Sequence, residues 1–284
     1  MSNSERISCT MTTTISLTEA SERLGVHYMT AYRYVRTGRL PAEKVAGQWH
    51  VTVEDLETFT TEEPAPPAPR GELIPPMLVE RLLAGDENGA FQLLESAMAS
   101  GAGAEEVYLD FISPSMTDIG TRWHDGEITV ADEHVASSTA LRVVSRLGPR
   151  ISTRGRNRGN VVLAVVSDDH HGLPTALLRD ILRSRGFGVH DLGANTPPES
   201  ILERAKATDD LIAIGLCSTK TGNDDIVRET LSVLNGGLDV PIIVGGASFK
   251  NEAHISSLGI CLASTTSRQA LALFDDVHAK RLAS

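Results

Sequence analysis

The last part of the chain, residues 159–284, alternates short apolar runs with longer stretches of helical period. The expected strands are residues 161–166, 189–192, 211–216, 241–244 and 260–262. Because most of these runs are almost wholly apolar, both of their faces must be buried, which is typical of parallel sheets covered by helices on two sides. The pattern therefore predicts a flavodoxin-like, doubly wound α/β domain with a five-stranded parallel sheet.

Polar turns follow the first and third expected strands, and a glycine pair follows the fourth. In doubly wound sheets, ligands bind outside the carboxyl ends of the strands, so these turns are expected to line one crevice. Paired glycines let a bulky group lie against the backbone, and a serine hydroxyl can donate a hydrogen bond to it. The residues expected to bind a ligand there are Asp169, His171, Gly172, Ser218, Thr219, Gly245 and Gly246.

The turn after the first strand has the composition of a metal-ligand unit. Asp169 precedes His171 by two residues, and such a carboxylate can hold one imidazole nitrogen while the other nitrogen binds a metal. Asp168 and His170 offer the same spacing in a rival register. No Gly-x-Gly-x-x-Gly sequence follows the first strand, which argues against a dinucleotide enzyme. A domain of this fold with a polar turn and no ligand is the plain alternative.

Residues 71–148 carry apolar side chains at helical spacing, with breaks at Gly85, at 101–103 and at 125–126. This pattern predicts a four-helix bundle. Its third turn concentrates unusual residues, because Trp123 and His124 end one expected helix while Glu133 and His134 open the next.

Aromatic and imidazole groups gathered at one turn are costly for packing alone, so we expect this turn to face a ligand. In the structural alternative, Trp123 is a core aromatic, Glu133 is a carboxylate in the first turn of its helix, and the two histidines have no role.

Residues 1–60 predict a small winged helix-turn-helix domain. The second helix is the expected recognition helix, and the hairpin is the expected wing. The expected elements are a helix from Ser16 or Thr18 to Gly25, a second helix from near His27, a hairpin over residues 40–51 and a closing helix over residues 53–59.

A local basic patch lies in this domain. Residues 33–50 hold four basic residues and one acidic residue, a net charge of +3 in a chain whose net charge is −11. DNA binding would therefore depend on the patch and not on the charge of the whole chain. A solvated surface of mixed charge is the alternative. The residues expected to contact DNA are Thr30, Arg33, Tyr34, Arg36, Arg39 and Lys44.

Two polar stretches separate the three segments: a Pro/Ala-rich linker at residues 61–70 and an Arg-rich connector at residues 149–158. The polar N-terminus lacks the apolar core of a signal peptide, and the longest apolar run is too short to cross a bilayer. Three widely spaced cysteines suit reduced thiols better than a disulfide framework. We therefore expect a cytoplasmic protein without membrane contact.

Taken in this order, the three segments resemble CarH-like adenosylcobalamin-dependent photoreceptor repressors. That family joins a MerR-like winged helix-turn-helix to a methionine-synthase-type cap bundle and a cobalamin-binding domain. The resemblance rests on the pattern Trp, nine residues, Glu-His at 123–134 and on the Asp-x-His, Ser and Gly-Gly signature of the α/β segment. Pro174 stands where the family signature has a final glycine, and Lys220 takes the third position of its serine motif. Both departures concern the channel for the nucleotide tail.

The resemblance implies that cobalamin lies between the bundle and the α/β domain. His171 would bind cobalt from below, with Asp169 behind it. The residues that would line the adenosyl pocket are Trp123, Val130, Glu133 and His134. Once light removes the adenosyl group, we expect a neutral imidazole close by, His124, to become the upper cobalt ligand.

The same resemblance implies a regulator without enzymatic activity, bound to operator DNA as a dark homotetramer that light converts to monomers or dimers. Three alternatives stay open. A corrinoid methyl-transfer protein would share the last two segments, although a DNA-binding head has no use in methyl shuttling. A regulator or photosensor of this architecture could bind another or an additional tetrapyrrole, such as a bilin or haem. A ligand-free regulator would keep only the fold.

Overall fold

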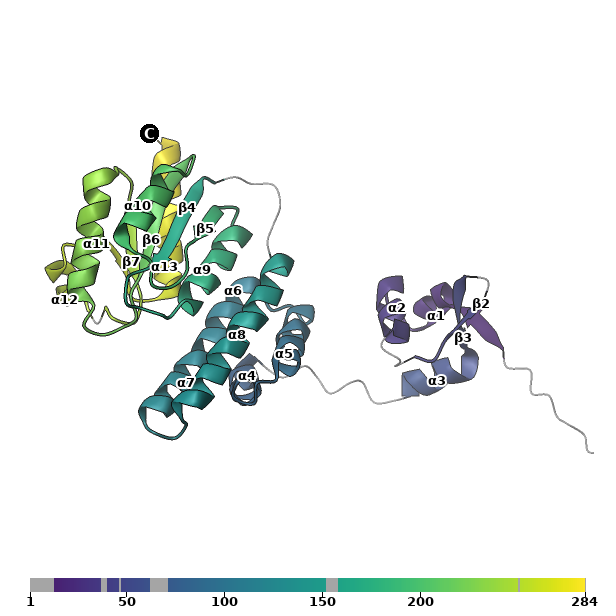
Figure 1. Cartoon of the computed structure of the whole chain (residues 1–284). Helices are drawn as coiled ribbons and strands as arrows, with labels where there is room; N and C mark the ends of the chain where they lie inside the picture. The colour runs from purple at the N-terminus through teal and green to yellow at the C-terminus, as the bar shows by residue number, and fades with distance from the viewer. Residues whose placement is uncertain are drawn as a thin grey trace, which may run out of the picture. The chain divides into compact units, whose positions relative to one another are not determined.

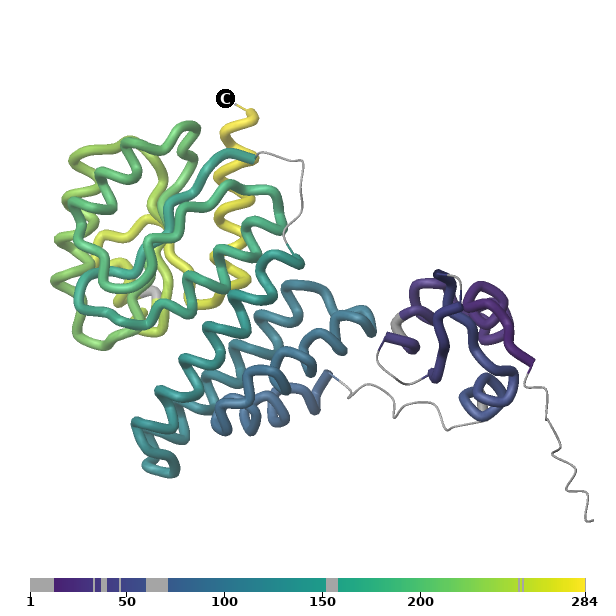
Figure 2. Tube along the Cα trace, turned by 45° about the vertical axis from the view of Figure 1, so that its right-hand side comes forward, coloured from purple at the N-terminus to yellow at the C-terminus, as the bar shows by residue number. Residues whose placement is uncertain are grey.

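The computed structural model of the chain describes residues 13–36, 40–45, 47–61, 71–151, 158–249 and 251–283. The chain divides into two compact units between Pro67 and Ala68. The first unit, here termed the head, has its own apolar core. The second unit contains the helical bundle and the α/β domain (Figures 1 and 2).

The head is a helix-turn-helix with a three-stranded antiparallel sheet. The Ser16 hydroxyl caps the first helix by accepting the Glu19 N–H at 3.2 Å. The first strand has no sequence signal because three residues are too few to show alternation; it pairs Ile15 with Val51. The elements are β1 (Thr14–Ser16), α1 (Leu17–Arg23), α2 (Tyr28–Arg36), β2 (Glu43–Val45), β3 (Gln48–Thr52) and α3 (Val53–Thr61).

The placement of Tyr34 on the outer face of α2 is wrong. Tyr34 packs against the core of the head, and its ring centroid lies 5.0 Å from that of Phe59 in α3. The helical period explains this, because Tyr34 follows the wholly buried Ala31 by three residues and shares its face.

The bundle has four helices, and the breaks between them fall at the predicted positions. The third helix runs through a π-helical stretch, which has no sequence signature. This stretch buries Tyr108 and Phe111, while Leu109 between them is only partly buried. None of the helices in the described residues is long and apolar enough to cross a membrane. The elements are η1 (Gly71–Leu73), α4 (Ile74–Leu83), α5 (Glu87–Ala99), α6 (Ala104–Glu106), η2 (Val107–Ile112), α7 (Ser113–His124) and α8 (Val130–Ile151).

The α/β domain has five parallel strands, as predicted, in the order β5-β4-β6-β7-β8. This is the flavodoxin-like order, and its switch point lies between β4 and β6. The last strand begins at Leu262, two residues later than expected. Helices α9 and α13 cover the face whose core continues into the bundle, and α10 to α12 cover the other face (Figure 1). The elements are β4 (Asn160–Val165), α9 (Leu173–Ser184), β5 (Gly188–Asp191), α10 (Pro198–Lys206), β6 (Leu211–Cys217), α11 (Asp224–Gly237), β7 (Ile242–Gly245), α12 (Glu252–Ser257), β8 (Leu262–Ser264) and α13 (Ser267–Ala283).

Candidate cofactor-binding site

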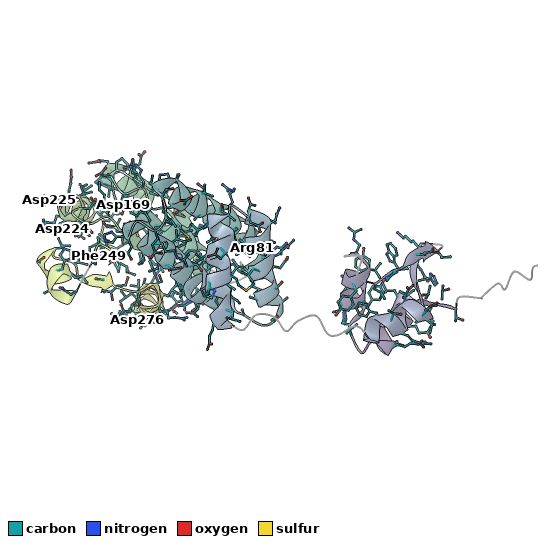
Figure 3. The ribbon with its side chains drawn as sticks, turned by 90° about the horizontal axis from the view of Figure 1, so that it is seen from below. Arg81, Asp169, Asp224, Asp225, Phe249 and Asp276 are labelled. Carbon is teal, nitrogen blue, oxygen red and sulfur yellow. The ribbon has the colours of Figure 1, made fainter. Side chains whose placement is uncertain are left out.

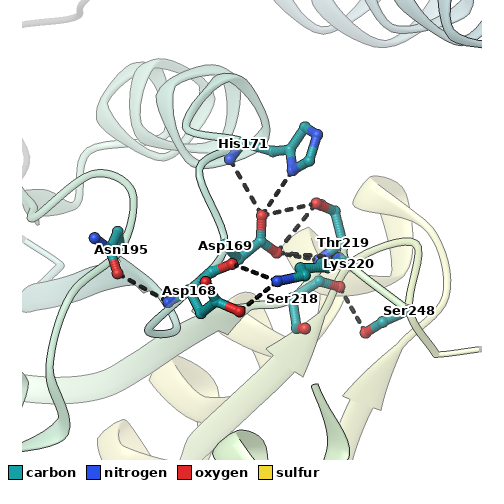
Figure 4. A network of polar contacts seen from close by, with 8 residues as sticks. All are labelled: Asp168, Asp169, His171, Asn195, Ser218, Thr219, Lys220 and Ser248. Atoms are coloured by element: carbon teal, nitrogen blue, oxygen red, sulfur yellow. Dashed lines mark hydrogen bonds and ion pairs between the residues drawn. The ribbon is translucent and has the colours of Figure 1, made fainter. Parts of the chain in front are cut away.

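Asp169 is the centre of the crevice at the carboxyl ends of β4 and β6. The residue is wholly buried, and hydrogen-bond donors surround its carboxylate (Figure 4). The Thr219 N–H donates to Oδ2 at 2.5 Å, the Lys220 N–H donates to the same oxygen at 3.2 Å, and the His171 N–H donates to Oδ1 at 3.1 Å. The Thr219 hydroxyl lies 3.1 Å from both oxygens. One carboxylate thus joins the turn after β4 to the turn after β6.

These hydrogen bonds decide the charge of Asp169. Burial alone would raise its pKa, but the donors from Thr219, His171 and Lys220 outweigh burial and hold the pKa of Asp169 below its ordinary value. The ionised carboxylate accepts the Nδ1 proton of His171 at 2.7 Å. The other ring nitrogen, Nε2, then carries the lone pair, and the His171 side chain is 66% exposed. This is the arrangement of a metal-binding imidazole.

Of the two Asp-x-His pairs, only one is hydrogen-bonded. The Asp168 carboxylate binds the Lys220 ammonium group, and the Asp168 N–H donates to the side-chain oxygen of Asn195 at 2.8 Å (Figure 4). Among the described residues, no hydrogen bond joins Asp168 to His170. The turn therefore presents His171, and not His170, on a carboxylate support.

A cavity of about 440 Å³ lies between the carboxyl ends of the strands and α7 of the bundle. Ser218, which precedes the cavity residue Thr219, is wholly buried, and its hydroxyl oxygen has no hydrogen-bond partner among the residues that the structure describes. A Cβ on Gly246 would lie 2.1 Å from the Ser218 backbone oxygen, and a Cβ on Gly245 would lie 2.7 Å from the Ser264 hydroxyl. Side chains are thus excluded from this wall of the cavity.

The turn between α7 and α8 exposes large apolar side chains. Trp123 is 49% exposed and Val130 is 53% exposed, so the alternative in which Trp123 is a core aromatic is wrong. His124 and His134 are exposed beside them. A reciprocal cap begins α8 at Val130: the Thr129 hydroxyl accepts the Asp132 N–H at 3.2 Å and the Asp132 carboxylate accepts the Thr129 N–H at 2.9 Å. Exposed apolar groups among polar ones are typical of a binding surface.

Glu133 is half-buried on α8 and is held by two neighbours. The Ser137 hydroxyl donates to Oε1 at 2.5 Å, and His134 Nδ1 donates to Oε2 at 2.7 Å. Burial would raise the pKa of Glu133, but the hydrogen bonds from Ser137 and His134 outweigh burial and hold the pKa below its ordinary value.

Sequence reasoning did not identify several residues of the site. Ser137 follows Glu133 by four residues, a helical spacing that indicates contact and was a usable signal. Three α7 residues line the cavity, Ser113, Met116 and Thr117. Their spacing places them on one helix face, but no local signal tells which face meets the α/β domain.

The residues predicted to contact DNA lie in the head. Arg36 and Lys44 are exposed, Thr30 is partly exposed, and the Lys44 ammonium group lies 5.9 Å from the centre of the Trp49 ring. Arg39 and the side chain of Arg33 lie outside the described residues. The part of the patch that the structure describes is available to a phosphate backbone.

Family comparisons agree with the three segments. Residues 14–64 match the model of a helix-turn-helix domain, and residues 77–147 and 159–271 match two models, each described as a B12 binding domain. Segments of the chain thus match a helix-turn-helix domain and, after it, two B12 binding domains.

Individual relatives divide between two kinds of protein. The chain is 31% identical over 151 residues to the HTH-type transcriptional repressor CarH of Myxococcus xanthus, a match that covers 51% of this chain and 48% of that protein. It is 22% identical over 219 residues to the methanol–corrinoid protein of Methanosarcina barkeri, covering 77% of this chain and 83% of that protein. The solved monomethylamine corrinoid protein of Methanosarcina barkeri has the same fold, with a TM-score of 0.63 at 19% identity over 72% of this chain and 98% of that chain.

We predict that Gly246→Ala destabilises the second unit more than Gly222→Ala does. Both glycines have positive φ, +123° and +91°, so each alanine adds backbone strain of about 1–2 kcal/mol. Only at Gly246 would the new Cβ also collide with the Ser218 backbone, which should cost about 1–3 kcal/mol more. Urea unfolding followed by circular dichroism compares the two. If both variants lose the same free energy of unfolding, the close approach of Gly246 to the Ser218 backbone is not needed for stability.

Proposed function

We propose that the protein is a light-responsive transcriptional regulator of the cytoplasm that binds adenosylcobalamin between its bundle and its α/β domain. The observation that carries the proposal is the pair Asp169 and His171, in which a buried, ionised carboxylate orients an exposed imidazole at the ligand edge of the sheet. The presence of a helix-turn-helix domain and B12-binding domains on one chain supports it.

The residues around this pair fit a cobalt corrin with a nucleotide tail. His171 would bind cobalt through Nε2, while Asp169 holds Nδ1. The adjoining cavity would take the tail, and the Ser218 hydroxyl, which has no partner in the described part of the chain, would donate a hydrogen bond to it. Gly245 and Gly246 would form the wall against which the tail packs. Gly172 and Thr219 complete the set, because Thr219 fixes Asp169 and Gly172 ends the turn before α9.

The bundle would supply the upper side of the pocket. Trp123, Val130, Glu133 and His134 would line the space for the adenosyl group, and the exposure of the two apolar side chains supports this role. When bound, adenosylcobalamin supplies a cobalt–carbon bond that light breaks. His124 would then bind the cobalt from above. Because His124 belongs to the bundle and His171 to the α/β domain, that bond would draw the two domains together and alter a surface used for assembly.

The head would bind operator DNA through Thr30, Arg33, Arg36, Arg39 and Lys44. Few phosphate contacts give weak binding by one head, so several heads on repeated half-sites are needed for stable binding. A dark homotetramer would provide them. Its conversion to monomers or dimers in light would release the DNA.

A second candidate is a corrinoid methyl-transfer protein. The similarity to the methanol–corrinoid protein, which covers 77% of this chain, favours it. The head distinguishes the two candidates, because residues 14–64 match the model of a helix-turn-helix domain, which methyl transfer does not require.

We predict that His171→Ala weakens cobalamin binding by at least about tenfold and changes the visible absorbance bands, since a metal–nitrogen bond is lost. His170→Ala is the matched control and should do neither, because Asp168 is paired with Lys220 instead. Titration with adenosylcobalamin in the dark measures both properties. If His170→Ala loses cobalamin binding while His171→Ala keeps it, His170 is the ligand instead.

We also predict that Arg36→Ala weakens operator binding and lowers the salt slope of binding by about one unit, because one phosphate contact is lost. Cobalamin uptake should be unchanged. Arg23→Ala is the control: it removes an exposed arginine of the head that is paired with Glu19 on α1. Fluorescence anisotropy with DNA selected by the full chain measures the effect. Equal DNA binding by residues 71–284 alone would rule out the head as the DNA-binding domain.

A further inference from the structure

A chain of polar groups that begins at two buried side chains crosses from the bundle into the α/β domain. Tyr108 lies in the π-helical stretch and is wholly buried, and its hydroxyl donates to Asp180 Oδ2 in α9 at 3.0 Å. Arg179 Nε donates to the other oxygen of Asp180 at 2.7 Å. Asp180 is 3% exposed, and a Cβ on Gly148 of α8 would lie 2.7 Å from its carboxylate. Glycine at that position therefore lets α8 close over the carboxylate.

The chain of contacts continues through β5 to the loop that follows it. Arg179 Nη1 donates to Asp191 Oδ2 at 3.4 Å, and Asp191 Oδ1 accepts the Gly193 N–H at 3.0 Å. Two residues later, the Asn195 N–H donates to the backbone oxygen of Asp169 at 2.9 Å, and the Asn195 side-chain oxygen accepts the Asp168 N–H. Hydrogen bonds and two short stretches of backbone thus connect Tyr108 to the turn that presents His171.

Two other polar contacts join the bundle to the α/β domain without leading to this turn. Arg268 of α13 donates to both carboxylate oxygens of Asp110 at 2.7 Å, and Arg185 lies 2.7 Å from Glu105. The side chains of the Arg268 pair are 57% and 48% exposed, so water screens that ion pair strongly. Asp110 is only two residues from Tyr108, which makes it a suitable control.

The balance of donors explains how a change at Tyr108 would travel. Among the described residues, Asp180 has two side-chain donors, Tyr108 and Arg179. Arg179 is shared with Asp191, and that contact, at 3.4 Å, is the longest of the path. If the Tyr108 hydroxyl is lost, a buried carboxylate oxygen lacks a donor, and Arg179 is the group that can replace it. Arg179 would then leave Asp191, and the loop after β5 would loosen.

We propose that Tyr108 and Arg179 are positioning residues for His171, through which the bundle sets the conformation of the His171 turn. The inference rests on the proposed function in one respect only, namely that His171 of this turn binds cobalt. A displacement of the bundle would then change the upper side of the pocket directly. Through Tyr108, it would also change how the turn holds His171, the lower cobalt ligand.

Hydrogen exchange of the full chain without cobalamin tests this directly. Tyr108→Phe removes only the hydroxyl, and Asp110→Asn is the matched control. In Tyr108→Phe, the amides of Asn195 and Thr196 should exchange about tenfold faster relative to the β6 amides, which report global unfolding. In Asp110→Asn, that ratio should stay at the wild-type value. With adenosylcobalamin added, Tyr108→Phe should also show a weaker His171 ligand in its absorbance spectrum, and Asp110→Asn should not.

If Tyr108→Phe does not fold, Arg179→Gln provides the same test. The Arg179 side chain is 23% exposed, so its replacement disturbs the core less. The proposal is overturned if neither Tyr108→Phe nor Arg179→Gln changes the ratio, or if Asp110→Asn raises it equally. Because exchange is measured without cobalamin, either result is independent of whether the wild-type chain binds the cofactor. The wild-type absorbance spectrum decides that separate question.

Discussion

The candidate site depends on one buried negative charge. A carboxylate out of water is stable only when donors surround it, and the backbone N–H groups of Thr219, Lys220 and His171 all point at Asp169. The same hydrogen bonds hold the turn after β4 against the turn after β6, at the switch point of the sheet. The direction of the His171 imidazole is therefore set by two strands and not by its own turn alone.

The rest of the second unit is arranged around that charge. The cavity beside it keeps its width because glycines stand where side chains would collide, and α7 of the bundle closes its other side. A single apolar core extends from the bundle to one face of the sheet, so the two sides of the cavity belong to one compact unit. The head has a separate core. In the proposed function, the effect of the cofactor would therefore reach DNA through the assembly of several chains.

Features with a local signal could be predicted from the sequence. The strands β4, β6 and β7 are largely continuous apolar runs, the bundle helices are divided by glycines, and Asp169 lies two residues before His171. Features that depend on tertiary contacts could not be predicted. Tyr34 is expected on the outer face of α2, but its ring packs on Phe59 of α3. No pattern of residues along the sequence marks the π-helical stretch. Lys220 pairs with Asp168 across 52 positions of sequence, so neither turn alone reveals the pair.

The size of the cobalamin-loaded chain in the dark and after green light tests the account most directly. Size-exclusion chromatography of the full chain, with absorbance confirming that the cofactor stays bound, should show a tetramer in the dark and a smaller species after illumination. His124→Ala should assemble in the dark like the wild type but should not form the stable illuminated species with cobalt bound from both sides. A wild-type elution volume that is the same in both conditions, with cobalamin bound, would contradict the account.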